Sequence, residues 1–191
     1  MGLILRWNNY LRKLLRKANE PHMIYGYRTA NGSFLKDTRI SNTAAISQPE
    51  NLELGDNVFI GHHNFIEASN GIKIGEGCQI TNFISVLSHS SHISIRLYGA
   101  EYRKHSDLQG YKKGAVNIGA YTFVGPHSTI MPGTNIGKGC LISAYSFVSG
   151  DFPDFSIIKG NPAVVVGNTK DLDKSYLQDP EIKKYYEAWA E

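Results

Sequence analysis

The chain has 191 residues, of which 41% are hydrophobic, and its formal net charge at pH 7 is +3. This length predicts one ordinary domain with terminal additions, and the hydrophobic content is enough for a buried core. The net charge is too weak to support nucleic-acid binding, so we expect no nucleic-acid partner.

Two features indicate the compartment. The apolar start of the chain is interrupted by Arg6 and no long apolar run follows, so we expect neither a secretory signal nor a membrane span. Cys78 and Cys140 are far apart and lack zinc-type spacing. We therefore favour buried free thiols in a reducing compartment over a disulfide, and we expect a cytoplasmic protein.

Residues 1–20 predict an amphipathic N-terminal helix, because apolar side chains recur at helical spacing. The apolar face would hold Leu3, Trp7, Tyr10, Leu11, Leu14 and Leu15, and the opposite face Arg6, Arg12, Lys13, Arg16 and Lys17. Such a helix either packs on the rest of the protein or a sister subunit, or lies on an anionic membrane surface. We favour packing and keep peripheral contact with the inner face of the membrane as the alternative.

A six-residue repeat follows the helix. The spacing is unbroken at Ile118, Val124, Ile130, Ile136, Ile142 and Val148. A small residue comes four places after each of the first five, at Thr122, Ser128, Thr134, Cys140 and Ser146. The pattern also occurs at Leu54, Ile60 and Ile66, and it returns after a two-residue slip at Ile74, Ile80 and Val86. We place its beginning at Ile40 and Ile46.

A six-residue period fits neither an α-helix nor a simple alternating strand. It predicts a short strand and a tight turn, repeated to form a solenoid of triangular coils with three hexads per coil. The aliphatic residues would point inward and stack on their equivalents in the next coil, so that the stack as a whole carries the stability. A β-sandwich with coincidental spacing is the alternative, and it is disfavoured because five consecutive hexads obey both inward positions.

The repeat is interrupted between Val86 and Ile118. A long excursion from a regular solenoid is usually functional or disordered. This one is rich in His, Arg, Tyr and Glu and poor in Gly, which favours a functional loop over a plain solvated linker. It opens with His89 and His92.

These hexads resemble those of the hexapeptide-repeat acetyltransferases. The loop resembles that of galactoside and maltose O-acetyltransferases, which begins with a histidine that is followed seven residues later by an arginine, as His89 is by Arg96. Similar sequences occur in the O-acetyltransferases of bacterial capsule, O-antigen and exopolysaccharide synthesis. The segments VNIGAYTFVGPHSTIMPG and FPDFSIIKGNPAVVVG also resemble the corresponding parts of these enzymes.

The resemblance implies an all-β fold, namely a left-handed parallel β-helix with a protruding loop and short terminal helices. We assign residues 21–165 to the β-helix, with the loop insertion at 87–116, and residues 166–191 to a C-terminal helical tail. It also implies a homotrimer. In the tail, Asp179 and Pro180 suit the start of a helix with an apolar stripe for core or interface packing. That stripe contains Ile182, Tyr185, Tyr186 and Trp189.

The same resemblance implies the chemistry, which is transfer of an acetyl group from acetyl-CoA to a sugar hydroxyl. It makes His89 the general base that removes the hydroxyl proton, with no covalent acyl-enzyme. The candidate acceptor or neighbour contacts are His62, His63, His92, Arg96, Tyr98, Glu101 and Arg103. For His92 a merely solvated side chain is an equal alternative, and we expect only one of His62 and His63 to face a cleft.

Coenzyme A contacts are implied at Pro126, Ala144, Ser149 and Gly150. The chain departs from the family pattern where cations usually hold the phosphates, because the turn reads Ser149-Gly150-Asp151 and Val164 and Gly167 follow Asn161-Pro162-Ala163. Lys159 and Lys170 are the candidate substitutes. This departure keeps open a non-catalytic β-helix scaffold as an alternative.

Two other functions remain as alternatives at this stage. One is N-acetylation of a nucleotide-linked amino sugar, whose amine needs less help from a base. The other is a γ-type carbonic anhydrase, a related solenoid with three zinc-binding histidines. The pair His89 and His92 is three residues apart where that enzyme needs five, so we expect no metal.

Overall fold

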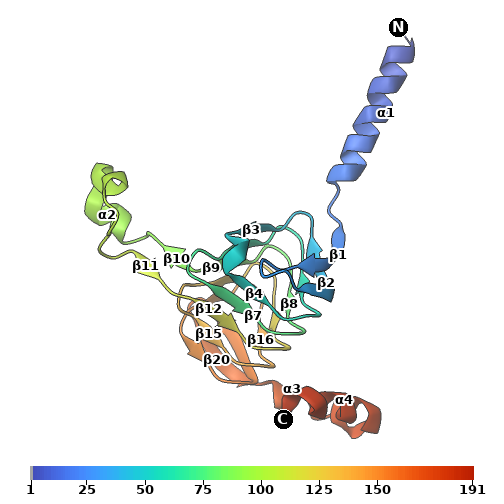
Figure 1. The fold of residues 1–191 in the computed structure, drawn as a ribbon. Helices are drawn as coiled ribbons and strands as arrows, with labels where there is room; N and C mark the ends of the chain where they lie inside the picture. The colour runs from blue at the N-terminus through green and yellow to red at the C-terminus, as the bar shows by residue number, and fades with distance from the viewer. Residues whose placement is uncertain (1) are drawn as a thin grey trace.

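The computed structural model describes residues 2–191, with the side chains of residues 7–17 in the first helix (Figure 1). The body of the molecule is a solenoid in which the chain passes repeatedly through three sheets. Sheet A has the order β1-β2-β5-β8-β13-β16-β19-β20. Its strands are Met23–Arg28, Phe34–Ser41, Phe59–Ile60, Gln79–Ile80, Phe123–Val124, Leu141–Ile142, Ser156–Gly160 and Ala163–Asn168.

Sheets B and C have five strands each, in the orders β17-β14-β9-β6-β3 and β18-β15-β12-β7-β4. In chain order, sheet B contains Ala45–Ser47 (β3), Phe65–Glu67 (β6), Ser85–Leu87 (β9), Thr129–Ile130 (β14) and Phe147–Val148 (β17). Sheet C contains Leu52–Leu54 (β4), Ile72–Ile74 (β7), Val116–Ile118 (β12), Asn135–Ile136 (β15) and Asp151–Phe152 (β18). The coils pair in parallel, except that antiparallel strands β1 and β20 close sheet A at its two ends.

The other elements lie outside the three sheets. A small hairpin joins β10 (His89–Ser90) to β11 (Lys112–Lys113). The α-helices are α1 (Gly2–Asn19), α2 (Ser94–Tyr98), α3 (Thr169–Asp173) and α4 (Pro180–Ala190). The 3-10 helices are η1 (Pro49–Asn51), η2 (Gly99–Lys104) and η3 (Tyr176–Gln178). None of the helices in residues 2–191 combines the length and apolar character needed to cross a bilayer.

The predicted inward positions form the core. Every aliphatic residue of the unbroken hexads is at most 4% exposed, and equivalent residues stack in register, as Val124 does on Ile142. The small residues are also buried, and their hydroxyls satisfy turn carbonyls: Thr122 Oγ1 donates to Gly137 O and Ser146 Oγ to Ser143 O. This confirms the solenoid prediction and shows why short polar residues suit these positions.

The cysteines are buried free thiols, as expected. Burial raises the pKa of Cys78 to about 11. The Cys78 thiol therefore stays protonated at neutral pH, which makes it inert as a nucleophile.

Two corners of the solenoid flank sheet B. The corner that leads from sheet A into sheet B carries four non-glycine residues in the left-handed region of φ, namely His63, Phe83, His127 and Tyr145. Their rings stack in sequence with centroids 5.0, 4.9 and 4.8 Å apart, and we call this the ladder corner. The coils approach closely there, since a Cβ on Gly125 would lie 2.5 Å from Ala144 N.

At the C-terminal end, Asp179 caps α4 as predicted, accepting hydrogen bonds from the backbone N–H groups of Glu181 and Ile182. The predicted apolar stripe packs only in part. Trp189 contacts the rings of Tyr121 and Phe155, whereas Ile182 and Tyr185 are exposed. The Lys138 ammonium donates to the last three carbonyls of the chain and so anchors the end of the helix to the solenoid.

Candidate active site

Every interruption of the six-residue spacing in the solenoid falls at one corner, where the chain leaves sheet B for sheet C. Ile46 and Leu54 are eight residues apart there, as are Ile66 and Ile74. The long loop leaves after β9 at the same corner and returns at β12 (Figure 1). We call this the insertion corner, and it brings the inserted segments of successive coils side by side.

His89 lies at this corner, paired with a buried carboxylate. Strand β6 pairs with β9 so that Glu67 is opposite Leu87, two residues before the histidine. His89 Nδ1 is 2.6 Å from Glu67 Oε2 and 3.0 Å from Ser69 Oγ. The histidine comes from the first turn of the loop and the glutamate from the coil before it.

The surroundings of Glu67 keep it ionised. Its carboxylate accepts hydrogen bonds from Ser88 Oγ at 2.9 Å and Ser69 N at 3.0 Å. Burial alone would raise the pKa of Glu67, but these hydrogen bonds and the adjacent His89 ring outweigh it, so the pKa lies below its usual value. At neutral pH the group is therefore a carboxylate that can only accept hydrogen bonds.

That carboxylate fixes the tautomer of the histidine. Because Glu67 accepts, Nδ1 of His89 carries the hydrogen, and the lone pair of Nε2 is left to take a proton. The ring is held on its face by Tyr111, with centroids 5.5 Å apart and planes 12° from parallel. An imidazole that is oriented in this way has the geometry that general-base chemistry requires.

A pocket of about 480 Å³ opens beside this pair. It lies between the insertion corner and the loop, and it includes Ser69 and Tyr111, the two residues that also contact the His89 ring. Its lining residues are Ser69, Asn70, Tyr102, Ser106, Asp107, Leu108, Tyr111 and Lys113. Two tyrosine rings and several hydrogen-bonding groups thus converge on a space next to the base.

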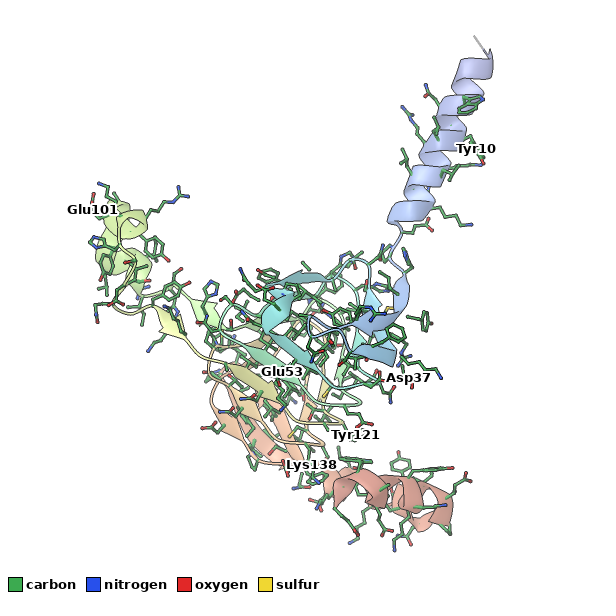
Figure 2. All side chains as sticks on the ribbon, viewed as in Figure 1. Tyr10, Asp37, Glu53, Glu101, Tyr121 and Lys138 are labelled. Atoms are coloured by element: carbon green, nitrogen blue, oxygen red, sulfur yellow. The ribbon has the colours of Figure 1, made fainter. Side chains whose placement is uncertain are left out.

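The other residues predicted in the loop lie in its protruding head, where Figure 2 labels Glu101. Their contacts are mainly local. Arg96 donates to the carbonyl of His92, Tyr98 Oη accepts from Gln109 N at 3.0 Å, and Glu101 pairs with Lys104. Arg103 is exposed in the same head.

His92 lies closer to the base of the loop, just after β10. Its Nδ1 is 2.8 Å from Ser90 Oγ and the side chain is exposed. It therefore remains available for a substrate contact without touching the His89–Glu67 pair in the contacts described.

His62 and His63 are at the opposite end of strand β6 from Glu67, at the ladder corner. His62 Nδ1 is 2.7 Å from Ser41 Oγ, and His63 is exposed and stacks on Phe83. Within one chain the structure does not bring either of them to the His89 pocket.

Two known family patterns match the chain. Residues 52–86 match the hexapeptide repeat of succinyl-transferase, and residues 115–150 match the bacterial transferase hexapeptide of six repeats. SAV2555 of Staphylococcus aureus, which is named as an acetyltransferase, is 42% identical over 77 residues, and these cover 39% of each chain. YvoF of Bacillus subtilis, also named as an acetyltransferase, is 31% identical over 74 residues.

Both matched segments are hexapeptide repeats of bacterial transferases, and with these relatives they support a hexapeptide-repeat acetyltransferase family. The aligned part spans about two fifths of the length of the relatives, 39% of SAV2555 and 43% of YvoF.

Solved structures show the same family fold. AntD, an N-acyltransferase from Bacillus cereus in complex with dTDP and 3-hydroxybutyryl-CoA, superposes with a TM-score of 0.58 at 20% identity, covering 75% of this chain and 88% of AntD. A maltose O-acetyltransferase from Clostridium difficile gives 0.57 at 23% identity, covering 66% and 64%. The solenoid is a left-handed parallel β-helix like that of these neighbours, as the sequence resemblance implied.

In this hexapeptide-repeat protein the six residues predicted to hold coenzyme A are spread over three corners. Pro126 and Ala144 are stacked at the ladder corner, where Tyr145 N donates to Pro126 O, and Lys159 follows in the next coil. Ser149 and Gly150 are exposed at the insertion corner. They follow strand β17, which is two strands from β9 in sheet B, and His89 comes just after β9. Lys170 lies over the Phe155 ring at 4.2 Å, at the third corner.

Four residues around His89 were not predicted from the sequence, namely Glu67, Ser69, Ser88 and Tyr111. Glu67 and Ser69 come from one coil and Ser88 from the coil stacked on it. A count of hexads alone does not show that a residue about twenty positions away in the chain lies beside His89. One signal was present, however. The two-residue slip between Ile66 and Ile74 spans Glu67 and Ser69, and it marks the corner where the loop later leaves.

Proposed function

We propose that this protein transfers an acetyl group from acetyl-CoA to a hydroxyl group of a sugar, in the synthesis of a bacterial surface polysaccharide. The observation that carries the proposal is the His89–Glu67 pair beside a polar pocket, two of whose lining residues, Ser69 and Tyr111, contact the His89 ring. A sugar hydroxyl is a poor nucleophile at neutral pH, and a base with a free ring nitrogen is what its attack on a thioester requires.

The reaction proceeds by direct transfer. The hydroxyl oxygen attacks the thioester carbonyl carbon while Nε2 of His89 takes the hydroxyl proton. The tetrahedral intermediate then collapses, the carbon–sulfur bond breaks, and the imidazolium gives the proton to the departing thiolate. The products are the sugar ester and free coenzyme A. The Glu67 carboxylate stabilises the imidazolium that exists between these two steps.

The pocket supports a carbohydrate acceptor. Tyr102 offers an aromatic ring for the apolar side of a pyranose, and Asn70, Ser106 and Asp107 offer partners for its hydroxyls. Lys113 adds one positive charge to the lining, which suits an acceptor that carries a carboxylate or phosphate.

The donor is proposed to reach His89 along sheet B. Ser149 and Gly150 lie at the insertion corner, and small exposed residues there allow a pantetheine arm to approach the backbone. We further propose that the active form is a homotrimer in which coenzyme A lies between neighbouring solenoids, with Lys159 near its phosphates.

The test is release of coenzyme A thiol from acetyl-CoA in the presence of a panel of sugars, nucleotide sugars and amino sugars. We expect turnover with at least one hydroxyl acceptor and a loss of about 10² to 10⁴ in kcat for His89→Ala. His22→Ala is the matched control, because its exposed ring contacts only Glu20 O in the structure. Absence of acetyl-CoA binding, or turnover that ignores His89, would overturn the proposal.

The same panel separates the N-acetylation alternative. An amine acceptor used in preference to every hydroxyl, at a rate that His89→Ala leaves unchanged, would replace sugar O-acetylation by amine acylation. Treatment of the product with mild base distinguishes the two, because base cleaves the ester and leaves the amide intact. Mass spectrometry before and after the treatment detects the loss of the acetyl group.

A further inference from the structure

Helix α1 projects away from the solenoid, and its described side chains, those of residues 7–17, lie apart from the sheets (Figure 1). Figure 2 labels Tyr10 on the projecting helix. Large apolar side chains are open to solvent there: Trp7 is 64% exposed, Tyr10 63% and Leu15 61%. The expected packing of this helix on the solenoid is therefore not found, and its apolar face lacks a partner within the described chain.

The two faces of α1 differ completely in character. On a helix of 3.6 residues per turn, Trp7, Tyr10, Leu11, Leu14 and Leu15 fall within an arc of roughly 140°. Over residues 7–17 the remaining arc is polar and basic, although by position Leu5 also falls within it. It carries Arg12, Lys13, Arg16 and Lys17.

The charge of the whole chain is concentrated in this segment. The chain has 20 Lys and Arg against 17 Asp and Glu. Residues 1–19 contain five of the cations and none of the acidic residues, so the other 172 residues hold 15 cations against 17 acids and are net negative by two. The positive charge therefore belongs to the helix and not to the solenoid.

We propose that α1 binds the surface of an anionic lipid bilayer, with its axis in the plane of the membrane. The apolar face would enter the boundary between headgroups and acyl chains, and Trp7 and Tyr10 are residues that favour that boundary. The cations on the other face would reach the lipid phosphates, since long basic side chains can extend toward the headgroups.

The charge pattern also argues against the other occupants of this face. A bundle of α1 helices from sister copies would bring five cations per helix together with no acidic residue in the segment to pair with them. A nucleic acid would match the charge but would leave the exposed apolar residues without a function. A bilayer with anionic headgroups matches both faces at once.

The experiment is co-sedimentation of the full chain with two kinds of vesicle, phosphatidylcholine alone and phosphatidylcholine mixed with phosphatidylglycerol. We expect binding to the mixed vesicles, weakening with added salt, and little binding to the neutral ones. Equal binding to both, or no binding to either, would overturn the proposal.

A matched pair of variants tests the apolar face. Leu11→Glu and Asn9→Glu change the charge of the helix equally, but Leu11 is on the apolar face and Asn9 on the polar one. Asn9→Glu should weaken binding about fivefold, the effect of one charge, and Leu11→Glu at least fiftyfold. An equal effect of the two substitutions would indicate that α1 binds polyanions by charge alone and would overturn the proposal. RNA gel shifts would then test whether the polyanion is a nucleic acid.

The mass of each variant in solution tests the remaining alternative, that a sister copy covers the apolar face. If Leu11→Glu lowered the oligomeric mass of the protein, the apolar face would be covered by a sister copy and the proposal would fail. The proposal does not depend on acyl transfer. Both variants should retain thiol release with a soluble acceptor, so failure of membrane binding and failure of the proposed activity give different results.

Discussion

The two corners that flank sheet B differ in how regularly the six-residue repeat is kept. At the ladder corner the chain keeps a separation of six residues between inward aliphatics in each of four coils, from Ile60 to Ile66 onward. At the insertion corner the separations between inward apolar residues are eight, eight, the long loop, six and then four, the last from Val148 to Phe152. The regular corner is filled by stacked rings, and the irregular one holds the His89–Glu67 pair and the pocket.

This difference shows how a repeat protein separates packing from chemistry. A corner that every coil repeats has its shape fixed by its neighbours above and below, so a new side chain there must stack. A corner that already accommodates extra residues leaves room for side chains whose partners come from another coil. The candidate site is found where the repeat is least regular.

The most direct test of this difference between the corners is to insert the same two residues at each of them. Ser-Asn placed between His63 and Asn64 would displace the buried Asn64 side chain, which hydrogen-bonds Thr81 O and Ile84 N. We expect a loss of about 4 kcal/mol or more in the free energy of unfolding, measured with urea.

The comparison insertion places Ser-Asn between Pro132 and Gly133 at the insertion corner. A Cβ on Gly133 would meet no atom within 4 Å, and the main cost of the inserted residues is the hydrogen bond from Gly133 N to Gly114 O. We expect a loss of less than about 1.5 kcal/mol. Equal losses at the two corners would refute the idea that only one of them tolerates extra residues.

The next largest effect concerns the acid partner of the base. Glu67→Gln preserves the shape of the side chain but removes the charge that fixes the His89 tautomer and stabilises the imidazolium. If the proposed function holds, kcat should fall about 10²-fold or more with little change in KM for acetyl-CoA. Glu53→Gln is the control, because Glu53 is exposed on sheet C and pairs only with Lys73.

A smaller effect tests the stacked rings. Tyr145→Ala removes the last ring of the ladder and should lower the free energy of unfolding by about 0.5–1.5 kcal/mol. Tyr176→Ala removes a ring of similar exposure, 68% against 71%, for which no ring stacking is found. It should change stability by less than about 0.5 kcal/mol, and a loss as large as that of Tyr145→Ala would show that stacking contributes nothing.

The smallest expected effect is on the acid side of the stability profile. Because the pKa of Glu67 in the folded protein is below its usual value of 4.5, folding favours the ionised group. Its contribution is complete above the pKa of the unfolded chain and is lost as the pH falls through the folded pKa. Urea midpoints measured from neutral to acidic pH should therefore decline less for Glu67→Gln than for the wild type, and parallel declines would contradict the lowered pKa.

The sequence predicts the solenoid well, because the inward positions repeat locally and each hexad reports its own burial. The six inward aliphatic residues of the unbroken hexads, from Ile118 to Val148, are all buried as expected, and so are the five small residues that follow them. His89 was singled out by a resemblance, because its spacing to Arg96 is similar to that in galactoside and maltose O-acetyltransferases. In each case the information lies within a few residues of chain.

What the sequence could not supply depends on stacking between coils and on folding within the loop. Glu67 and Ser69 reach His89 only because β6 lies beside β9. Arg96, Tyr98 and Glu101 make local contacts in the head of the loop, which no spacing reveals. The exposed face of α1 was likewise not decided by its pattern, since amphipathic helices pack on proteins and on lipids alike.

The antiparallel strands β1 and β20 have a consequence for assembly. A stack of parallel coils leaves unpaired backbone groups at its first and last turn, and a second molecule could in principle add there to build a fibre. At both ends of sheet A the chain instead reverses direction and pairs with itself. An incoming coil would have to match all three faces of the triangle at once, so sealing one of them is enough to give the molecule a fixed length.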